Sequence, residues 1–309
     1  MNTIDIFSVP WDVSTTYRHG CSKGPQHIQS AYLQLDHSHP FIDQECVLNF
    51  RPIDQHIIDL NHQFSDKSHQ IIKKLNQSIP LTIDDEDNLF KINEASEQLN
   101  DLVYRSSIDL LSQRSFLLCG GEHGVGVGYL KSLSEKYSNF SILQLDSHMD
   151  CRKNYFGYKY SHASVVTHYS EIDSVFQITQ VGIRDFDYEE VEYQQQSKTN
   201  FTIFKDYWLH KQLFQGRLWH DICEEIINSL TDHVFISLDV DGLTPYLCPG
   251  TGTPVPGGIG FNQLIYLVEL LYKRKKIIGA ELVEVNNQDN NDFDANVGAR
   301  LLHLMAAML

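Results

Sequence analysis

The chain has 309 residues, 42% of them hydrophobic and 21% charged, which is ordinary for a soluble globular protein and allows a substantial core. A formal net charge of −16 argues against nucleic-acid binding, because a nucleic-acid footprint needs a basic face. Residues 1–11 do not resemble a signal peptide, and the best apolar run, 264–272, is too short to span a bilayer. We therefore expect neither a nucleic-acid partner nor a membrane partner.

The cysteines are scattered through the chain without a C-x-x-C pair, a pattern that fits neither a disulfide framework nor a zinc ribbon. Reduced thiols in a cytoplasmic protein are the simplest interpretation. The six residues are Cys21, Cys46, Cys119, Cys151, Cys223 and Cys248.

The N-terminal part alternates between strand and helix patterns. A short apolar segment predicts a strand at residues 4–9, and Gly24-Pro25 opens a predicted helix that continues through Ala31. Residues 43–60 are predicted to hold one or two strands, with 57–60 the clearest.

The next part contains a predicted loop and the longest predicted helix. Residues 76–88 are mostly polar, with Pro80 and an acidic run, and predict a loop or turn. Apolar residues recur at helical spacing over 89–113, so we expect a helix with one face on the core. A strand is predicted at 115–119, and 125–137 can form another helix.

The C-terminal half repeats this alternation. Strands are predicted at 140–145, 176–183, 233–238 and 275–285. Between them, residues 189–200 predict a surface helix end with a loop, and 248–258 a loop rich in Gly and Pro. Residues 286–296, rich in Asn and Asp, predict a loop, and 297–309 predict a final apolar helix.

Alternating strands and helices predict a mostly parallel sheet with helices on both faces. The chain shows no convincing linker and no internal repeat. We therefore predict a single three-layer α/β domain over residues 1–309.

Potential metal ligands follow the predicted strand at 140–145. Asp146, His148 and Asp150 occupy alternate positions, and alternate residues of an extended segment point the same way. Two carboxylates and one imidazole would therefore meet at one point. A polar strand-to-loop turn is the alternative for any one of these residues, but it explains all three in register less well.

Further candidate ligands fall just past other predicted strands. His123 follows the strand at 115–119, whereas Asp239 and Asp241 follow the strand at 233–238 with the same alternate spacing. Sites in open parallel sheets form at the carboxyl ends of the strands. We therefore expect these three side chains to join the first cluster.

The types of ligand indicate the metal. Four carboxylates and two imidazoles are too many for one tetrahedral zinc ion, but they suit two adjacent ions that share carboxylates. Oxygen-rich ligation favours Mn²⁺, and the imidazoles make Mg²⁺ and Ca²⁺ less suitable. Two such ions can bind one water between them and lower its pKa toward neutrality. The sequence therefore predicts two Mn²⁺ per chain.

Three segments together resemble the metal-binding signatures of the ureohydrolase family, which includes arginases and agmatinases. They are Gly120-Gly121-Glu122-His123, Asp146-Ser147-His148-Met149-Asp150 and Ser237-Leu238-Asp239-Val240-Asp241. The likeness covers nearly the whole chain, and residues 155–164 and 180–184 are most similar to the agmatinase branch. The resemblance implies an arginase-like fold and a homo-oligomer, either a trimer or a hexamer.

The resemblance also implies roles for individual residues. One Mn²⁺ would be held by His123, Asp146, Asp150 and Asp239, and the other by Asp146, His148, Asp239 and Asp241. Glu284 matches the guanidinium-binding glutamate, since a carboxylate can make paired hydrogen bonds to a planar cation. His162 matches the histidine that shuttles protons to the leaving amine. Asp150, His162 and Glu284 are the predicted catalytic residues.

The implied reaction is attack of a metal-bridging hydroxide on the carbon of a small cationic guanidino substrate. It would release urea and an amine, and agmatine is the favoured substrate. The chain departs from the family pattern at Glu122, Ser147, Thr244 and Asn287, where Asp, Ala, Asp and Pro are usual. Arginase, guanidinobutyrase and formimidoylglutamase activities therefore remain alternatives, as does a non-catalytic metal-binding relative.

The functional roles of three candidate side chains are less firmly indicated by the sequence than those of the metal ligands. Glu284 could pair with a surface cation at the end of its strand, and His162 lacks a spacing argument of its own. Arg152 could face a substrate carboxylate, which would favour an acidic guanidino or formimino substrate. For Arg152 we favour a structural ion pair.

Overall fold

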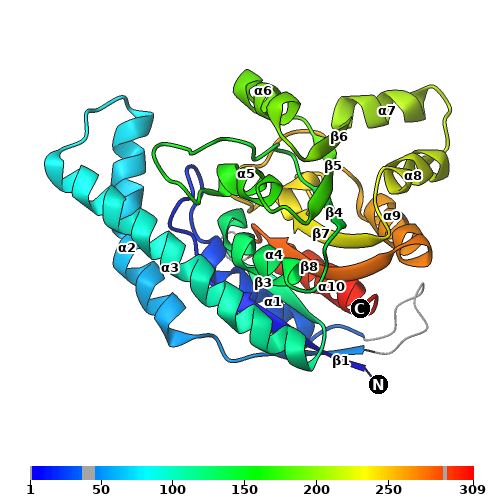
Figure 1. Ribbon diagram of the computed structural model, residues 1–309, viewed down its shortest axis with the longest axis horizontal. Coiled ribbons are helices and arrows are strands. Elements are labelled where there is room, and N and C mark those ends of the chain that lie inside the picture. Colours follow the sequence, from blue (N-terminus) through cyan, green and yellow to red (C-terminus); the bar gives the residue numbers. More distant parts are fainter. Residues whose placement is uncertain (1, 37–45, 288–290) are drawn as a thin grey trace.

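A single sheet of parallel strands organises the computed structural model, which describes residues 2–36, 46–287 and 291–309 (Figure 1). In the described residues the sheet has eight strands in the order β2-β1-β3-β8-β7-β4-β5-β6, and every neighbouring pair is parallel. The strands are β1 (Asn2–Val9), β2 (Cys46–Phe50), β3 (Phe116–Gly120), β4 (Phe140–Leu145), β5 (Val175–Ile183), β6 (Asn200–Lys205), β7 (His233–Asp239) and β8 (Lys276–Val283).

Helices cover both faces of this sheet, so the prediction of a three-layer α/β domain is confirmed (Figure 1). One hydrophobic core lies under α1, α8, α9 and α10, and the other lies under α2, α3, α4 and α5. The helices are α1 (Gly24–Tyr32), α2 (Gln55–Asn76), α3 (Ile83–Gln113), α4 (Val127–Ser134), α5 (Val165–Ser170), α6 (Tyr188–Gln196), α7 (Asp206–Phe214), α8 (Trp219–Asn228), α9 (Phe261–Arg274) and α10 (Phe293–Ala306).

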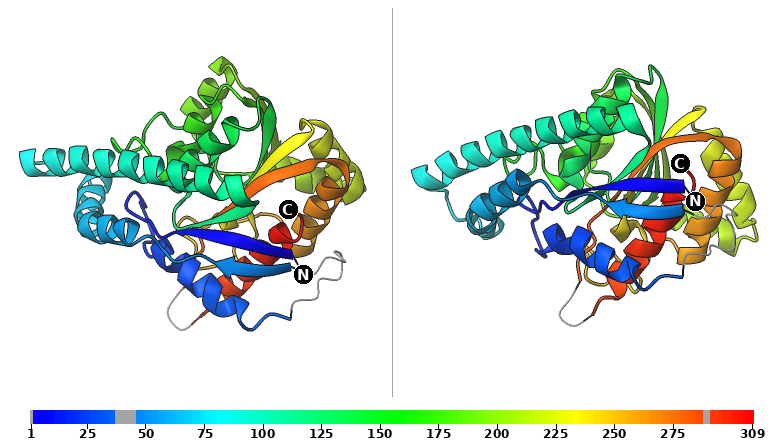
Figure 2. Two further views of the ribbon diagram at one scale, coloured as in Figure 1. Left: turned by 60° about the horizontal axis from the view of Figure 1, so that its bottom comes forward. Right: turned by 90° about the horizontal axis from the view of Figure 1, so that it is seen from below.

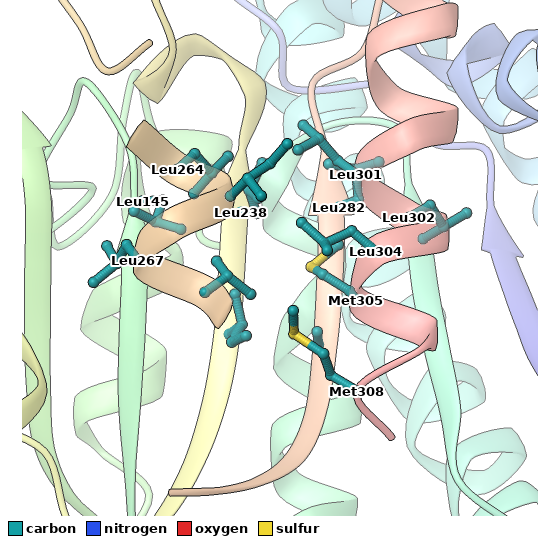
Figure 3. Close-up of a cluster of buried hydrophobic side chains, with 14 of the residues drawn as sticks. Leu145, Leu238, Leu264, Leu267, Leu282, Leu301, Leu302, Leu304, Met305 and Met308 are labelled. Carbon is teal, nitrogen blue, oxygen red and sulfur yellow. The ribbon is translucent and has the colours of Figure 1, made fainter. Parts of the chain in front are cut away.

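The central strand β4 shows why the apolar runs fold this way. Phe140 and Ile142 contribute to one core, and Leu143 and Leu145 contribute to the other. A strand with both faces covered needs apolar residues at nearly every position. Figure 3 shows the core under α9 and α10, where leucines of β4, β7 and β8 meet leucines of these two helices together with Met305 and Met308.

The predicted strand at residues 57–60 is wrong, because these residues lie in α2. The helix begins after Asp54, whose side chain accepts a hydrogen bond from the backbone N–H of His56. Ile57, Leu60 and Phe64 are buried at helical spacing, and they form the inner face. The strand within the predicted region 43–60 is β2, and residues 43–45 lie outside the described residues.

The predicted loop at residues 76–88 is wrong in its last part, because α3 already begins at Ile83. Thr82 and Asp85 form a capping box in which each side chain accepts from the other's backbone N–H. The acidic residues of the first turn also face the positive end of the helix dipole. Helices α2 and α3 form a hairpin that projects beyond the sheet (Figure 2).

The remaining differences are smaller. α10 begins at Phe293, inside the predicted loop 286–296, of which residues 288–290 lie outside the described part. The predictions did not include α5, β6, α7, α8 or α9. None of the helices in the described residues has the length and apolarity needed to cross a membrane. All six cysteines are buried and carry free thiols.

Candidate metal centre

The six predicted metal ligands lie together at the carboxyl ends of three strands. His123 begins a short 3-10 helix, η2 (His123–Gly126), after β3. Asp146, His148 and Asp150 follow β4, while Asp239 ends β7 and Asp241 lies in η4 (Val240–Gly242). The sheet order places β3, β8, β7 and β4 side by side, and this order brings the three segments together. Two groups of potential ligand atoms result: His123, Asp146 and Asp239, and Asp146, His148 and Asp241.

His123 has the environment expected of a metal ligand. Its Nδ1 atom is buried without a hydrogen-bond partner, although carboxylate oxygens of Asp150 and Asp146 lie 3.0 and 3.3 Å away. The other ring nitrogen, Nε2, lies 2.8 Å from the hydroxyl oxygen of Ser237, which donates to Glu281. This contact fits an Nε2 that carries the proton and leaves the Nδ1 lone pair for a cation.

The pKa of His123 supports the same view of its surroundings. Burial by itself lowers this pKa, but the neighbouring carboxylates of Asp146, Asp150 and Glu281 raise it well above its ordinary value. A proton and a metal ion compete for the same lone pair. The field that favours the protonated imidazole would therefore also favour a bound cation.

The second group is ordered by short hydrogen bonds. Nδ1 of His148 lies 3.0 Å from Oδ2 of Asp241. Ser147 donates to the other Asp241 oxygen through its backbone N–H at 3.0 Å and through its hydroxyl at 2.8 Å. Asp146 accepts from the side chain of Gln144 at 2.8 Å and from the backbone N–H of His148 at 2.7 Å. Each carboxylate is thus held in one orientation before any ion binds.

The carboxylates are crowded in a way that calls for positive charge. Burial and the neighbouring Asp146 raise the pKa of Asp150 to about 7. Burial and the neighbouring Asp241 raise the pKa of Asp239 well above its ordinary value. Buried like charges disfavour ionisation, and a divalent cation among them would relieve that cost. The donor set therefore fits the predicted metal pair.

Glu284 lies beside this cluster, directly after β8. Its Oε1 atom accepts a hydrogen bond of 3.0 Å from the backbone N–H of His123. Burial raises the pKa of Glu284 to about 8, with Asp241 acting in the same direction. Both Glu284 and Asp150 have positive φ angles, 64° and 52°, a backbone conformation that costs energy and is often found at functional sites.

An open cavity of about 280 Å³ adjoins the cluster. Its lining includes His148, Asp150 and His162, so two predicted metal ligands and the predicted proton shuttle face one space. Arg152 also lines the cavity, but its guanidinium lies 3.7 Å from Asp187 and 3.8 Å from Glu190. Arg152 thus forms ion pairs within the chain, as favoured from the sequence.

His162 is held by contacts with residues 14–16 that sequence reasoning missed. Its backbone N–H donates to the hydroxyl of Ser14 at 3.1 Å, and its Nε2 atom lies 3.4 Å from Oγ1 of Thr16. Burial and the nearby His148 lower the pKa of His162 to about 3, so the imidazole is neutral. No spacing pattern links residues so far apart in the sequence, and the polar run at 14–16 was the only local signal.

Glu122, which stands where the family usually has Asp, contacts Ser14, the residue that holds His162. Its buried carboxylate accepts the backbone N–H of Ser14 at 2.8 Å and the Ser14 hydroxyl at 2.9 Å. Burial and the neighbouring Glu284 raise the pKa of Glu122, and the bonds from Ser14 act in the opposite direction. The longer side chain is thus engaged with the loop that contacts His162.

Comparison with known proteins places this site in context. A model of the arginase family matches residues 2–307. An N(1)-aminopropylagmatine ureohydrolase of Thermus thermophilus is 30% identical over 208 residues, which cover 67% of each chain. Agmatinase of Pyrococcus horikoshii is 28% identical over 303 residues, covering 98% of this chain and 90% of that one. The crystal structure of agmatine ureohydrolase of Thermoplasma volcanium has a similar fold, with a TM-score of 0.73 at 22% identity over 99% of this chain and 89% of that one.

Proposed function

Because the chain belongs to the arginase family, we propose that it is a dimanganese amidinohydrolase that splits a small cationic guanidino compound into urea and an amine. One observation carries the proposal most directly. The Nδ1 atom of His123 is buried and unpaired among carboxylates, and one of these, Asp146, also belongs to the second group of ligand atoms. Such an arrangement supports two ions with a shared carboxylate.

The cluster residues would hold the ions, and the residues around them would handle the substrate. The proposed ligands are His123, Asp146, His148, Asp150, Asp239 and Asp241. When bound, the ions would supply a water molecule acidified toward hydroxide. Asp150, which also lines the cavity, would accept a hydrogen bond from that water.

Glu284 and His162 have separate tasks in this proposal. The Glu284 carboxylate would receive the guanidinium group and orient its carbon by charge-assisted hydrogen bonds. His162, neutral and at the cavity, can take up a proton released during the attack and return it to the leaving amine. Without that proton the amine would have to leave as an anion.

Agmatine is the substrate we favour. Two of the relatives are named agmatinase and N(1)-aminopropylagmatine ureohydrolase. The cavity itself supports a cationic tail, because Asp185 lines it and Arg152, the cation most suited to a substrate carboxylate, is paired with Asp187 and Glu190. Arginine, guanidinobutyrate and formiminoglutamate all carry a carboxylate and are the alternatives.

Three coarser properties complete the proposal. We treat residues 1–309 as one ureohydrolase-like domain built on the single sheet. The free, buried thiols support a reducing compartment such as the cytoplasm. A trimer or hexamer follows from family likeness, and light scattering of the purified chain measures it.

The decisive experiment is a substrate panel. Urea or formamide release is measured with agmatine, arginine, guanidinobutyrate and formiminoglutamate, each with Mn²⁺ and with a chelator. We expect release from agmatine that is abolished by the chelator and by Asp146→Ala. If two metals bind per chain and no compound is hydrolysed, the proposal fails and a non-catalytic metal-binding protein becomes the better interpretation.

A further inference from the structure

Ser14 lies between a buried carboxylate and the ring of His162. Its backbone N–H and its hydroxyl donate to the two oxygens of Glu122, at 2.8 and 2.9 Å. The same hydroxyl oxygen accepts the backbone N–H of His162 at 3.1 Å and lies 3.5 Å from Nδ1 of that residue. Glu122 is fully buried and Ser14 is 3% exposed, so protein groups surround this chain of contacts.

The direction of these hydrogen bonds restricts where the proton of His162 resides. A serine hydroxyl has one proton, and with Glu122 ionised Ser14 gives that proton to Oε1 of the carboxylate. Towards Nδ1 of His162 the Ser14 oxygen therefore presents only a lone pair. An unprotonated Nδ1 would face it lone pair to lone pair, which is repulsive, whereas a protonated Nδ1 would be attracted.

The other neighbours of the ring are compatible with a protonated Nδ1. The Ser161 hydroxyl oxygen lies 3.4 Å from Nδ1 and can either accept or donate there. Thr16 can likewise donate to Nε2, from which its Oγ1 atom is 3.4 Å away. Of these hydroxyls, only that of Ser14 is committed, because only Ser14 is held by a carboxylate.

We propose that Glu122, acting through Ser14, fixes the tautomer of His162, with the proton on Nδ1 and the reactive lone pair on Nε2. Glu122 and Ser14 are thus positioning residues for the proton shuttle. The inference deepens the proposed function and takes its meaning from it. The tautomer itself is a property of the resting protein, and it can be measured without turnover.

Glutamine at position 122 provides a sharp test, because it should reverse the chain of hydrogen bonds. The Ser14 N–H can only donate, so it would take the amide oxygen, and the amide NH₂ would then face the Ser14 hydroxyl oxygen. The Ser14 proton would become free to point at Nδ1 of His162. The imidazole would carry its proton on Nε2 instead, in a protein of nearly unchanged shape.

The measurement is long-range proton–nitrogen NMR of the full-length chain labelled with nitrogen-15 in its histidines. These spectra distinguish the two tautomers, and the signal of His162 is the one missing from His162→Asn. Spectra are recorded without metal and with Zn²⁺, because Mn²⁺ is paramagnetic and broadens the signals. Ser161→Ala serves as the matched control, since it removes the other hydroxyl near Nδ1.

We expect a proton on Nδ1 in the unaltered protein and in Ser161→Ala, and a proton on Nε2 in Glu122→Gln. A proton on Nε2 in the unaltered protein would overturn the proposal, since either Ser161 or a neutral Glu122 would then set the tautomer. An unchanged tautomer in Glu122→Gln would overturn it as well.

With agmatine, Glu122→Gln should lower kcat at least about 100-fold, the lower end of general acid–base effects, with KM and metal content unchanged. If the unaltered protein hydrolyses no substrate, the proposed function fails, but the inference about the tautomer does not, because NMR determines the tautomer without turnover.

Discussion

Nδ1 of His123 lies 3.0 Å from Oδ2 of Asp150, a distance at which two such atoms normally share a proton, yet Nδ1 has no hydrogen-bond partner. The other ring nitrogen, Nε2, contacts Ser237 at 2.8 Å, and this contact fits a proton on Nε2. A lone pair and a carboxylate that face each other at this distance attract a common cation. A metal ion bound between His123 and Asp150 should therefore stabilise the fold.

Divalent metal should therefore raise the free energy of unfolding. A ligand present at 100 times its dissociation constant stabilises the folded state by about 2.7 kcal/mol. Thermal unfolding with Mn²⁺ and with a chelator measures this difference. Asp239→Asn should act in opposite directions in the two conditions. It removes a buried carboxyl group whose pKa is raised, so the metal-free protein should become more stable. It also removes a proposed metal ligand, so the gain in stability on adding Mn²⁺ should become smaller. A fall in metal-free stability would contradict this account of the centre.

Glu284→Gln should weaken substrate use without disturbing the fold. Glutamine keeps an oxygen for the backbone N–H of His123, the contact that Glu284 makes at 3.0 Å. It loses the negative charge, and a hydrogen bond to a charged group contributes about 1.5–3 kcal/mol. We expect kcat/KM for agmatine to fall about 10- to 100-fold, with metal content and melting temperature little changed. Loss of metal together with activity would show that Glu284 has a structural role instead.

Arg184 should be irreplaceable by lysine. Its guanidinium donates to the carbonyl oxygens of Gly182, Asp241, Leu243 and Val255, at 2.6 to 3.2 Å. Lysine has a single ammonium group and cannot match this fork of donors. Arg184→Lys should therefore loosen the loop beside Asp241 and lower metal affinity about 10- to 100-fold, as is usual when a group that supports a metal ligand is lost. Isothermal titration with Mn²⁺ checks this, and an unchanged affinity would exclude the supporting role.

A pair of stacked histidines away from the centre should make stability depend on pH. The rings of His19 and His69 are stacked with their centroids 3.5 Å apart, and burial lowers the pKa of both. Each group has its ordinary pKa of 6.5 in the unfolded chain, so below that pH the unfolded state binds more protons. The stability that the pair contributes is complete above pH 6.5 and is lost as the pH falls toward the lowered values.

His69→Phe isolates this effect, because it keeps a flat ring against His19 and removes one titrating group. The melting temperature of the variant relative to the unaltered protein should rise as the pH is lowered from 7.5 to about 5. Scanning calorimetry of both proteins in the same buffers gives the comparison. A difference that does not change with pH would mean that the pair is not linked to folding.

The strands that line the centre were predictable because their sequence is continuous and apolar. Strand β4 has the predicted bounds, β5 and β7 differ from the predicted ones by one residue at one end, and β3 is shifted by one residue. Helix α2 was missed because its apolar residues are interspersed with polar ones, and a four-residue apolar run suits helix and strand equally. The edge strand β6 was missed because it is only partly buried and lacks such a run.

The metal ligands of the site were also predictable from local patterns, whereas the contacts between distant residues were not. The alternate spacing at 146–150 and 239–241 brings ligands together within one segment, and strand ends bring the segments together. The contact of Ser14 with Glu122 joins residues 108 positions apart and leaves no periodic trace in the sequence. Only the three-dimensional arrangement reveals which hydroxyl faces His162.

The position of β8 has a consequence for synthesis of the protein. This strand is the last one in sequence order among the described residues, and it lies between β3 and β7. The halves of the centre that follow β3 and β7 therefore meet across it. A nascent chain on the ribosome cannot close the centre until residues 276–283 have emerged, and until then β3 and β7 each present an unpaired edge. The binding of the two proposed ions must therefore follow the synthesis of β8. Variants that slow the insertion of β8 should aggregate during expression even when the finished fold is stable.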